Sequence, residues 1–165
     1  MYRIKESIHV NAPIDRCFLL STSIDLVAQS LRMQPVSGQT TGLVVNGSRL
    51  TWRGWKFGLP AWHETLITAY DRPAFFQDTM ASGMFRSFQH DHRFQDIDGQ
   101  TLLIEIVRFS LPLGPLGKAV AKRIVIPHIL ATMQNRFQLI KRIAESSDWE
   151  QYVIASGLQT GIQSG

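Results

Sequence analysis

The sequence predicts a single α+β domain, in which a curved antiparallel sheet of about seven strands wraps around one long C-terminal helix, with two short helices after the first strand. Three observations predict it. Short alternating segments separated by turn residues fill the stretch from Val36 to Phe109, which is typical of an antiparallel meander. An earlier alternating pattern at Tyr2–Val10 precedes two helical patterns, and a long apolar stripe at helical spacing follows the meander. With 165 residues, 44% of them hydrophobic, the chain is long enough to bury its own core.

Two short helices are expected directly after the first strand. Asn11 is placed to cap the first of them, and Pro13 suits its first turn, where a missing N–H is harmless. Ser23 offers a cap for the second helix, over residues 24–31. That helix must end before Pro35, because the residue ahead of a proline avoids the helical conformation.

One strand of the meander loses its alternation at Gly54, where we expect a bulge or a strong bend. Bent strands are what a sheet needs in order to wrap around another element. Turn chemistry divides the rest of the meander at these points: Asn46-Gly47, Gly58-Leu59-Pro60, Asp71-Arg72-Pro73, Ser82-Gly83 and Asp98-Gly99.

The long C-terminal helix is expected from about Gly117 to Ser146, lying across the sheet. Pro127 interrupts it, so we expect a kink there or a new helix that begins at that point. Residues 1–150 should form the domain, and residues 151–165, rich in Ser, Gly and Gln, a disordered tail. The apolar stripe of the helix comprises Ile126, Leu130, Met133, Phe137, Ile140 and Ala144.

The strongest local signal is the Asp98-Gly99 turn between two alternating segments, which predicts a tight hairpin with Ile97 facing Gln100. Residues opposite each other in such a hairpin share a face of the sheet. The expected wall is mostly apolar, and its polar members are two histidines and one glutamate. The pairs that form it are Phe94 with Leu103, His92 with Glu105, His90 with Val107 and Phe88 with Phe109.

His92 opposite Glu105 is the candidate catalytic pair, because a carboxylate beside an imidazole keeps a proton available near neutral pH. The same pairing also satisfies two polar groups on a cavity wall without any chemistry, which favours a structural or ligand-orienting role. His90, His92 and Glu105 resemble a metal triad by type. The sequence supplies no clear further ligand or second shell, so we expect no metal and no cofactor.

Large rings gather around the expected bend, where they either line a cavity entrance or fill the core. Together with the hairpin wall and two residues of the helix stripe, they make up the expected ligand-binding set. Its members are Trp52, Trp55, Phe57, Trp62, His63, Phe88, His90, His92, Phe94, Leu103, Glu105, Val107, Phe109, Met133 and Phe137.

The charge pattern argues against nucleic acid as a partner. The formal charge of +4 comes from 17 basic and 13 acidic residues that are scattered except at Lys118, Lys122 and Arg123, and no nucleic-acid-reading motif accompanies them. The single cysteine, Cys17, excludes an internal disulfide and fits a reducing compartment.

We expect a cytoplasmic protein. Met1 leads straight into an alternating strand pattern without the apolar run of a signal peptide, and no segment is apolar enough to span a bilayer. Stable membrane insertion is therefore not expected. The basic and apolar segment Leu116–Ile126 suits a transient contact with an anionic membrane surface.

The order of elements and several short stretches resemble the START-related (SRPBCC) superfamily, which includes the major birch pollen allergen, lipid-transfer domains and bacterial polyketide cyclases. The likeness is to a bacterial branch often labelled polyketide cyclase or dehydrase, and it covers about the first 150 residues. Pro127 departs from the uninterrupted helix usual there. The stretches are Asn11-Ala12-Pro13, Trp52-Arg53-Gly54, Phe57-Gly58-Leu59-Pro60, Gly83-Met84-Phe85, His90-Asp91-His92-Arg93-Phe94 and Pro112-Leu113-Gly114-Pro115-Leu116-Gly117.

This resemblance implies the helix-grip fold, with a deep cavity between the sheet and the long helix. We expect a carrier or sensor that binds an apolar small molecule there, such as a lipid, a polyketide or an aromatic-like compound. One alternative is a cyclase or dehydratase that uses His92 and Glu105 as an acid and base pair. The other is a protein-interaction module whose cavity is filled by side chains. Fold alone does not decide among them, and the sequence does not predict an oligomeric state.

Overall fold

The structure is a computed structural model that describes residues 1–56, 58–112 and 114–154. Within these residues, the strands of one sheet are β1 (Tyr2–Val10), β2 (Met33–Gly38), β3 (Arg49–Lys56), β4 (Leu59–Asp71), β5 (Phe75–Ser82), β6 (Ser87–Ile97) and β7 (Gln100–Ser110). Their order across the sheet is β1-β7-β6-β5-β4-β3-β2, and each neighbouring pair is antiparallel. The predicted meander therefore runs without a crossover from β2 to β7, and β1 joins it beside β7.

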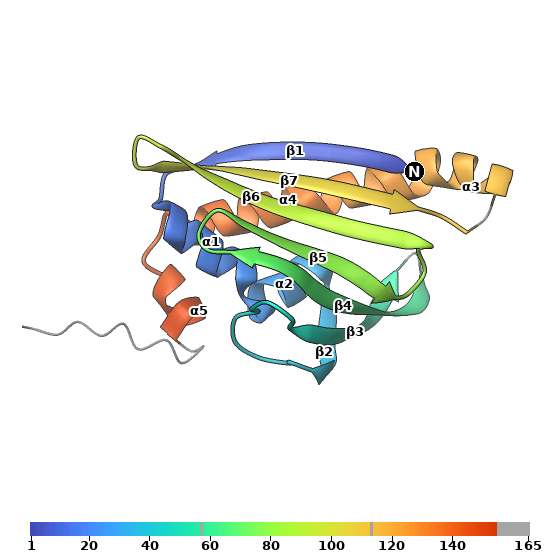
Figure 1. The fold of residues 1–165 in the computed structure, drawn as a ribbon, viewed down its shortest axis with the longest axis horizontal. Helices are drawn as coiled ribbons and strands as arrows, with labels where there is room; N and C mark the ends of the chain where they lie inside the picture. The colour runs from blue at the N-terminus through green and yellow to red at the C-terminus, as the bar shows by residue number, and fades with distance from the viewer. Residues whose placement is uncertain (57, 113, 155–165) are drawn as a thin grey trace, which may run out of the picture.

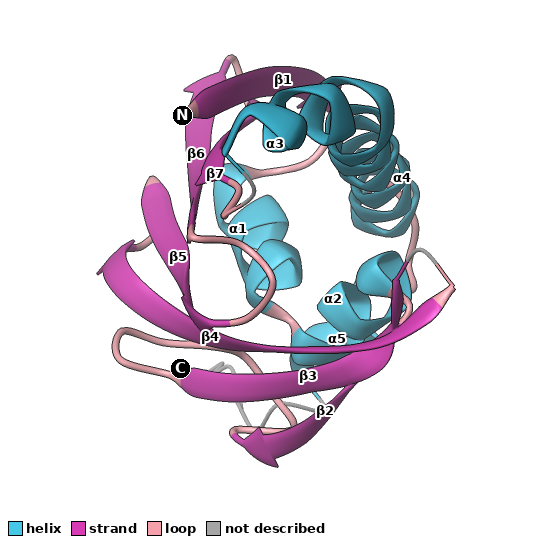
Figure 2. Ribbon diagram, turned by 90° about the vertical axis from the view of Figure 1, so that its right-hand side faces the viewer, coloured by secondary structure: helices cyan, strands magenta, loops and turns pink. Residues whose placement is uncertain are grey.

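The helices lie on the concave side of this sheet, which curves around them (Figure 1, Figure 2). The long helix α4 lies closest to β1 and β7, while α2 lies nearer to β3 and β2 (Figure 2). These positions confirm the predicted fold class. The helical elements are α1 (Ile14–Thr22), α2 (Ile24–Leu31), α3 (Gly114–Val120), the π-helix η1 (Ala121–Val125), α4 (Ile126–Ala144) and α5 (Trp149–Ile154).

The start of α1 differs from the prediction, because Asn11 does not cap it. Pro13 occupies the N-cap position in an extended conformation, and the backbone N–H of Asn11 donates to Glu145 Oε1 at 2.7 Å instead. Ser23 does stand at the N-cap of α2, although its side chain makes no capping hydrogen bond. The predicted bounds of α2 are confirmed, since Arg32 adopts a left-handed conformation and ends the helix.

The bulge expected at Gly54 is not found. β3 pairs with β4 in unbroken register through Gly54, and register shifts occur instead in β2 and at two points of the β4–β5 pairing. A glycine is needed at position 54 because β2 passes close to it. A Cβ atom on Gly54 would lie 2.8 Å from Met33 Cγ and 3.1 Å from the carbonyl oxygen of Arg32.

The change expected at Pro127 is a change of helix type, since α4 begins at Ile126 directly after the π-helix η1 and the helical structure is continuous. The preceding turn η1 is a π-helix, in which the N–H of Ile126 donates to the carbonyl oxygen of Ala121, five residues back. Pro127 then lies in the first turn of α4, where its missing N–H leaves no bond broken. The wide turn allows α4 to continue along the sheet without a clash from the proline ring.

The disordered tail predicted for residues 151–165 does not begin at residue 151. Residues 151–154 belong to α5, and Val153 is buried in the core that also contacts Trp149 and Tyr152. The Arg16 guanidinium lies over the Trp149 ring, 4.5 Å from its centroid. Three aromatic or apolar side chains thus hold this end of the chain, and residues 155–165 lie outside the described part. In the described residues, no helix combines the length and the apolar character that a membrane crossing needs.

Candidate functional site

A cavity of about 180 Å³ lies between the concave face of strands β3–β7 and the helices α2 and α4. Its walls are mostly apolar, with Trp52, Ile67, Val107 and Met133 among them. Trp62 and Met84 are exposed at its rim, so they mark the opening. Apolar walls with a few converging polar groups are the usual composition of a small-molecule site. This cavity is not filled by side chains, which argues against the filled-cavity interaction module.

The predicted register of the β6–β7 hairpin is confirmed. The structure pairs Ile97 with Gln100, Phe94 with Leu103, His92 with Glu105, His90 with Val107 and Phe88 with Phe109. The left-handed Asp98 (φ 53°) and Gly99 (φ 83°) supply the two-residue turn that this register requires.

His92 lies between two carboxylates at the inner end of the cavity. Its Nδ1 is 3.1 Å from Glu105 Oε1, and its Nε2 is 2.9 Å from Asp78 Oδ2. Two such hydrogen bonds need two protons, so the ring donates both as an imidazolium or one of the carboxyls is protonated. The side chains of His92 and Glu105 have no exposed surface. His92 therefore borders the cavity but is sealed by its partners.

Of the two histidines on β6, His90 is the one that a molecule in the cavity can reach. Its side chain is 12% exposed, and its ring centroid lies 3.9 Å from that of His92. Its Nε2 contacts Glu105 Oε2 at 3.2 Å without hydrogen-bond alignment, and its Nδ1 is 3.8 Å from Asp78 Oδ2. The two histidines thus contact the same two carboxylates, one ring behind the other.

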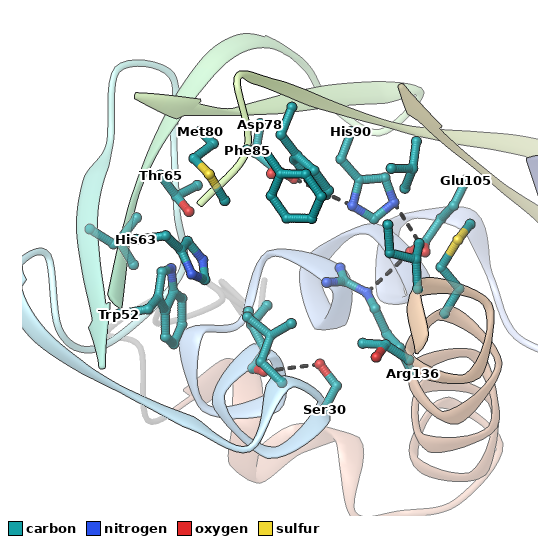
Figure 3. Close-up of a pocket in the computed structure, with 18 of the residues that line it drawn as sticks. Ser30, Trp52, His63, Thr65, Asp78, Met80, Phe85, His90, Glu105 and Arg136 are labelled. Atoms are coloured by element: carbon teal, nitrogen blue, oxygen red, sulfur yellow. Dashed lines mark hydrogen bonds and ion pairs between the residues drawn. The ribbon is translucent and has the colours of Figure 1, made fainter. Parts of the chain in front are cut away.

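Arg136 of α4 completes this inner cluster, which consists of Asp78, His90, His92, Glu105 and Arg136. Its Nε lies 3.1 Å from Glu105 Oε1, and its Nη2 donates to the carbonyl oxygen of Ser21 at 2.9 Å. Figure 3 shows His90, Glu105 and Arg136 pointing toward one another, across the cavity from Trp52 and His63. A helix and three strands therefore bring charged groups to one buried point.

Burial and neighbouring charges shift the pKa values of the inner-cluster residues. Burial alone would raise the pKa of Glu105, but the Arg136 guanidinium and the two imidazoles outweigh it and hold this pKa well below its usual value. Burial would likewise raise the pKa of Asp78. The hydrogen bond with His92 outweighs this effect, so the pKa of Asp78 is also lowered. Burial, reinforced by His92, lowers the pKa of His90. Near neutral pH, His90 is therefore a neutral base beside two carboxylates.

The outer part of the cavity carries a second set of basic side chains. The Nζ of Lys56 donates to the carbonyl oxygen of Leu31 at 2.8 Å, and burial lowers its pKa. Burial also lowers the pKa of His63 to about 4, although Asp78 opposes the shift. His128 of α4 lines the same region. These groups, from β3, β4 and α4, add polar atoms to the cavity wall.

The cavity contains part of the expected ligand-binding set. The expected residues that line it are Trp52, Trp62, His63, Phe88, His90, His92, Glu105, Val107 and Met133. Trp55 does not line it, because it alternates with Trp52 onto the outer face of β3, where it is 68% exposed. Phe57 lies outside the described residues.

Four expected wall residues belong to the core rather than to the cavity. Phe94, Leu103 and Phe137 pack with Phe18 in the cluster beneath α1, and Phe109 packs with Tyr2 and Val107 at the other end of β7. The face of the hairpin is as predicted, but it is longer than the cavity. Side chains from α1 and α4 fill both of its ends.

Sequence reasoning missed Asp78 and Arg136. Asp78 alternates with Phe76 and Met80 on the inner face of β5, directly opposite His90 in the β5–β6 register. Arg136 is a charged residue at helical spacing from Met133 and Ile140, both of which belong to the apolar stripe. A charge placed within an apolar helix stripe is the signal that would have identified Arg136, because such a charge must find a buried partner.

No protein-family model matches this sequence, and no curated protein matches it either. Solved structures do match. A protein from Thermus thermophilus aligns with a TM-score of 0.68 and 13% identity, over 88% of this chain and 100% of that one. The Zhui aromatase/cyclase from a Streptomyces species aligns with a TM-score of 0.67 and 10% identity, over 88% and 97% of the two chains. Ginseng major latex-like protein 151 from Panax ginseng aligns with a TM-score of 0.62 and 11% identity, over 88% and 98%.

These alignments extend over nearly the whole described chain, and at such identities they concern the fold. The chain has the helix-grip fold that these solved structures share, which is the fold that the resemblance of its motifs implies. The same fold here encloses a mostly apolar cavity with a charged inner end. The fold alone does not define a function.

Proposed function

We propose that this protein binds an apolar small molecule in the cavity, as a carrier or sensor, with a polar group of the ligand directed toward the inner cluster. One observation carries the proposal, namely an open, mostly apolar cavity that ends at the partly exposed His90 beside a buried ion-pair cluster. An entirely apolar molecule would leave that end unsatisfied, at a cost of about 1–3 kcal/mol per group. A lipid, polyketide or aromatic-like molecule with one polar end avoids this cost.

The test uses the full chain and a fluorescent apolar anion, 1-anilinonaphthalene-8-sulfonate, as the probe. Thr65 lines the cavity and Thr68 is exposed on the same strand, so the same substitution can be made at both. We expect Thr65→Trp to weaken probe binding at least about tenfold by filling the cavity, and Thr68→Trp to leave it unchanged. Equal affinities for the two variants would refute binding in this cavity. Native mass spectrometry of the purified protein, followed by denaturation, identifies any molecule that the chain carries.

A second candidate function is proton transfer on the bound molecule, as a cyclase or dehydratase would perform it. The observation that favours it is a neutral imidazole, His90, at the cavity surface beside Glu105. In this version His90, rather than the sealed His92, touches the ligand. The distinction is measurable, because in this version His90→Gln would abolish turnover even at saturating concentrations of a candidate substrate, whereas a loss of affinity alone would be overcome by saturation.

A further inference from the structure

We propose that Asp78, His90 and His92 bind a divalent transition-metal ion at the inner end of the cavity. Two histidines and one carboxylate, with the remaining positions open, are a ligand set that suits zinc and iron(II). The proposal does not depend on the apolar ligand, because the metal alone can be tested. It also reverses the sequence-based expectation of no metal, which rested on the lack of a further ligand and of a second shell.

The strand register supplies the missing ligand. His90 and His92 lie two residues apart on one face of β6, and Asp78 lies opposite His90 on β5. One donor atom from each of these three residues lies within 4.8 Å of the others. Neighbouring strands place alternate residues at fixed separations, so the three donors are held on rigid elements rather than on loops.

The distances suit a metal centre after small movements. Asp78 Oδ2 is 2.9 Å from His92 Nε2 and 3.8 Å from His90 Nδ1. Bonds of about 2.0–2.1 Å at tetrahedral or octahedral angles separate ligand atoms by roughly 2.9–3.4 Å. The Asp78–His92 separation already falls in that range, and the His90 ring must move toward Asp78 by less than about 1 Å.

Glu105 supplies the second shell. Its Oε1 is 3.1 Å from His92 Nδ1, and its Oε2 is 3.2 Å from His90 Nε2. One carboxylate therefore contacts one nitrogen of each ring, and the other nitrogen of each ring faces Asp78. A metal-bound histidine usually donates its second N–H to a carboxylate in this way, which fixes the tautomer and the ring orientation. Arg136 stays paired with Glu105 and leaves Asp78 as the ligand carboxylate.

Binding exchanges one proton for one ion, because the proton between His92 Nε2 and Asp78 is released to solvent. Asp78 and Glu105 bring two negative charges, and Arg136, which pairs with Glu105, brings one positive charge. The loaded site therefore has a net charge of +1, which a hydroxide or an anionic group of a cavity ligand would neutralise. Because the three ligands come from one wall, the remaining coordination positions face the cavity. A water molecule or the polar atom of a cavity ligand would occupy them.

The experiment titrates the full chain, first dialysed against a chelator, with Zn²⁺ or Co²⁺ alone and measures stoichiometry and affinity by calorimetry. We expect one ion per chain. His90→Gln and His92→Gln should each weaken binding by at least about a hundredfold, and Glu105→Gln by about ten- to a hundredfold, as for an outer-shell partner. His9→Gln is the matched control, because His9 is exposed on β1 and lies outside both the triad and the cavity. It should bind with unchanged affinity.

Absence of binding to the unmodified chain would overturn the proposal. So would binding that survives in the His90 and His92 variants, since the ion would then occupy another site. X-ray absorption of the Zn²⁺-loaded unmodified chain gives the ligand set even where a variant fails to fold. It should show two imidazoles with oxygen ligands, and a sulfur ligand would contradict the site. Probe binding to the metal-free chain tests the apolar cavity separately, so either proposal can fail alone.

Discussion

The ring of His92 stacks on the ring of Phe76, with centroids 4.0 Å apart and planes inclined by 10°. The two residues face each other across β5 and β6, and Phe76 in turn packs edge-on against Phe18 of α1. One face of His92 therefore belongs to the hydrophobic core, while its edges contact Asp78 and Glu105. This arrangement joins the inner cluster to the core, so the charged site and the stability of the fold depend on the same residue.

Removing the charge of Glu105 should destabilise the fold strongly. Glu105→Gln leaves the buried Arg136 without its carboxylate, and breaking a buried ion pair from one side costs about 3–5 kcal/mol. The matched control is Glu64→Gln. Glu64 pairs with an Arg49 side chain that is 58% exposed, and such surface pairs contribute less than about 1 kcal/mol. Urea denaturation measures both, and equal losses would show that the inner cluster does not support the fold.

Stability should fall as the pH is lowered from 6.5 to about 4, and His63 should account for part of the loss. Burial lowers the pKa of His63 from 6.5 to about 4, so in this window the unfolded chain binds a proton that the folded chain does not. The lowered pKa of His90 acts in the same direction. His63→Gln should therefore reduce the dependence of the unfolding free energy on pH, whereas His9→Gln, at an exposed position, should not. An unchanged slope in His63→Gln would contradict this assignment.

The carboxylates add a separate loss at lower pH. The pKa values of Glu105 and Asp78 are lower in the folded chain than their usual values of 4.5 and 3.8. Their contribution to stability is therefore present above those values and is lost as the pH falls through the folded-state values. Acid unfolding of Glu105→Gln should show less of this final loss, in the same denaturation series.

The parts of the site that could be predicted are those that local chemistry determines. A two-residue turn at Asp98-Gly99 leaves one register for the hairpin, so the pairing of His92 with Glu105 followed from the sequence. Pro127 likewise marked the place where the helix type changes, because it lies in the first turn of α4. Asp78 depends on a longer connection between β5 and β6, and no turn type sets that register. Arg136 depends on how α4 rotates against the sheet.

The extent of the cavity could not be predicted for a related reason. Phe94 and Leu103 share the face of His92, and the alternation of β6 and β7 places them correctly. Whether such a residue lines a cavity or fills the core depends on what covers it. Phe18 from α1 covers this end, 5.3 Å from Phe94 between ring centroids. That contact joins segments distant in sequence, which periodicity does not report.

Gly54 should tolerate no side chain while Met33 is present. A Cβ atom would lie 2.8 Å from Met33 Cγ, so Gly54→Ala should cost about 1–3 kcal/mol through overpacking. In the background of Met33→Ala, the same substitution should cost less, because the flexible side chain is gone and only the backbone contacts with the carbonyl oxygen of Arg32 and the Cα of residue 33 remain. A double-mutant cycle measured by thermal unfolding gives the coupling between the two positions. Additive effects would mean that another contact requires the glycine.

Substitutions of His90 and His92 should have different effects, the first on ligand affinity and the second on the stability of the fold. His92 has no exposed side-chain surface and contacts both carboxylates, so His92→Gln should destabilise the fold by at least about 2 kcal/mol more than His90→Gln. His90 is partly exposed to the cavity, so His90→Gln should change the affinity for a ligand with a polar end while the fold remains stable. Urea denaturation measures the first effect and probe titration the second. The opposite pattern, with a stable His92→Gln chain of altered affinity, would make His92 the residue that the ligand contacts.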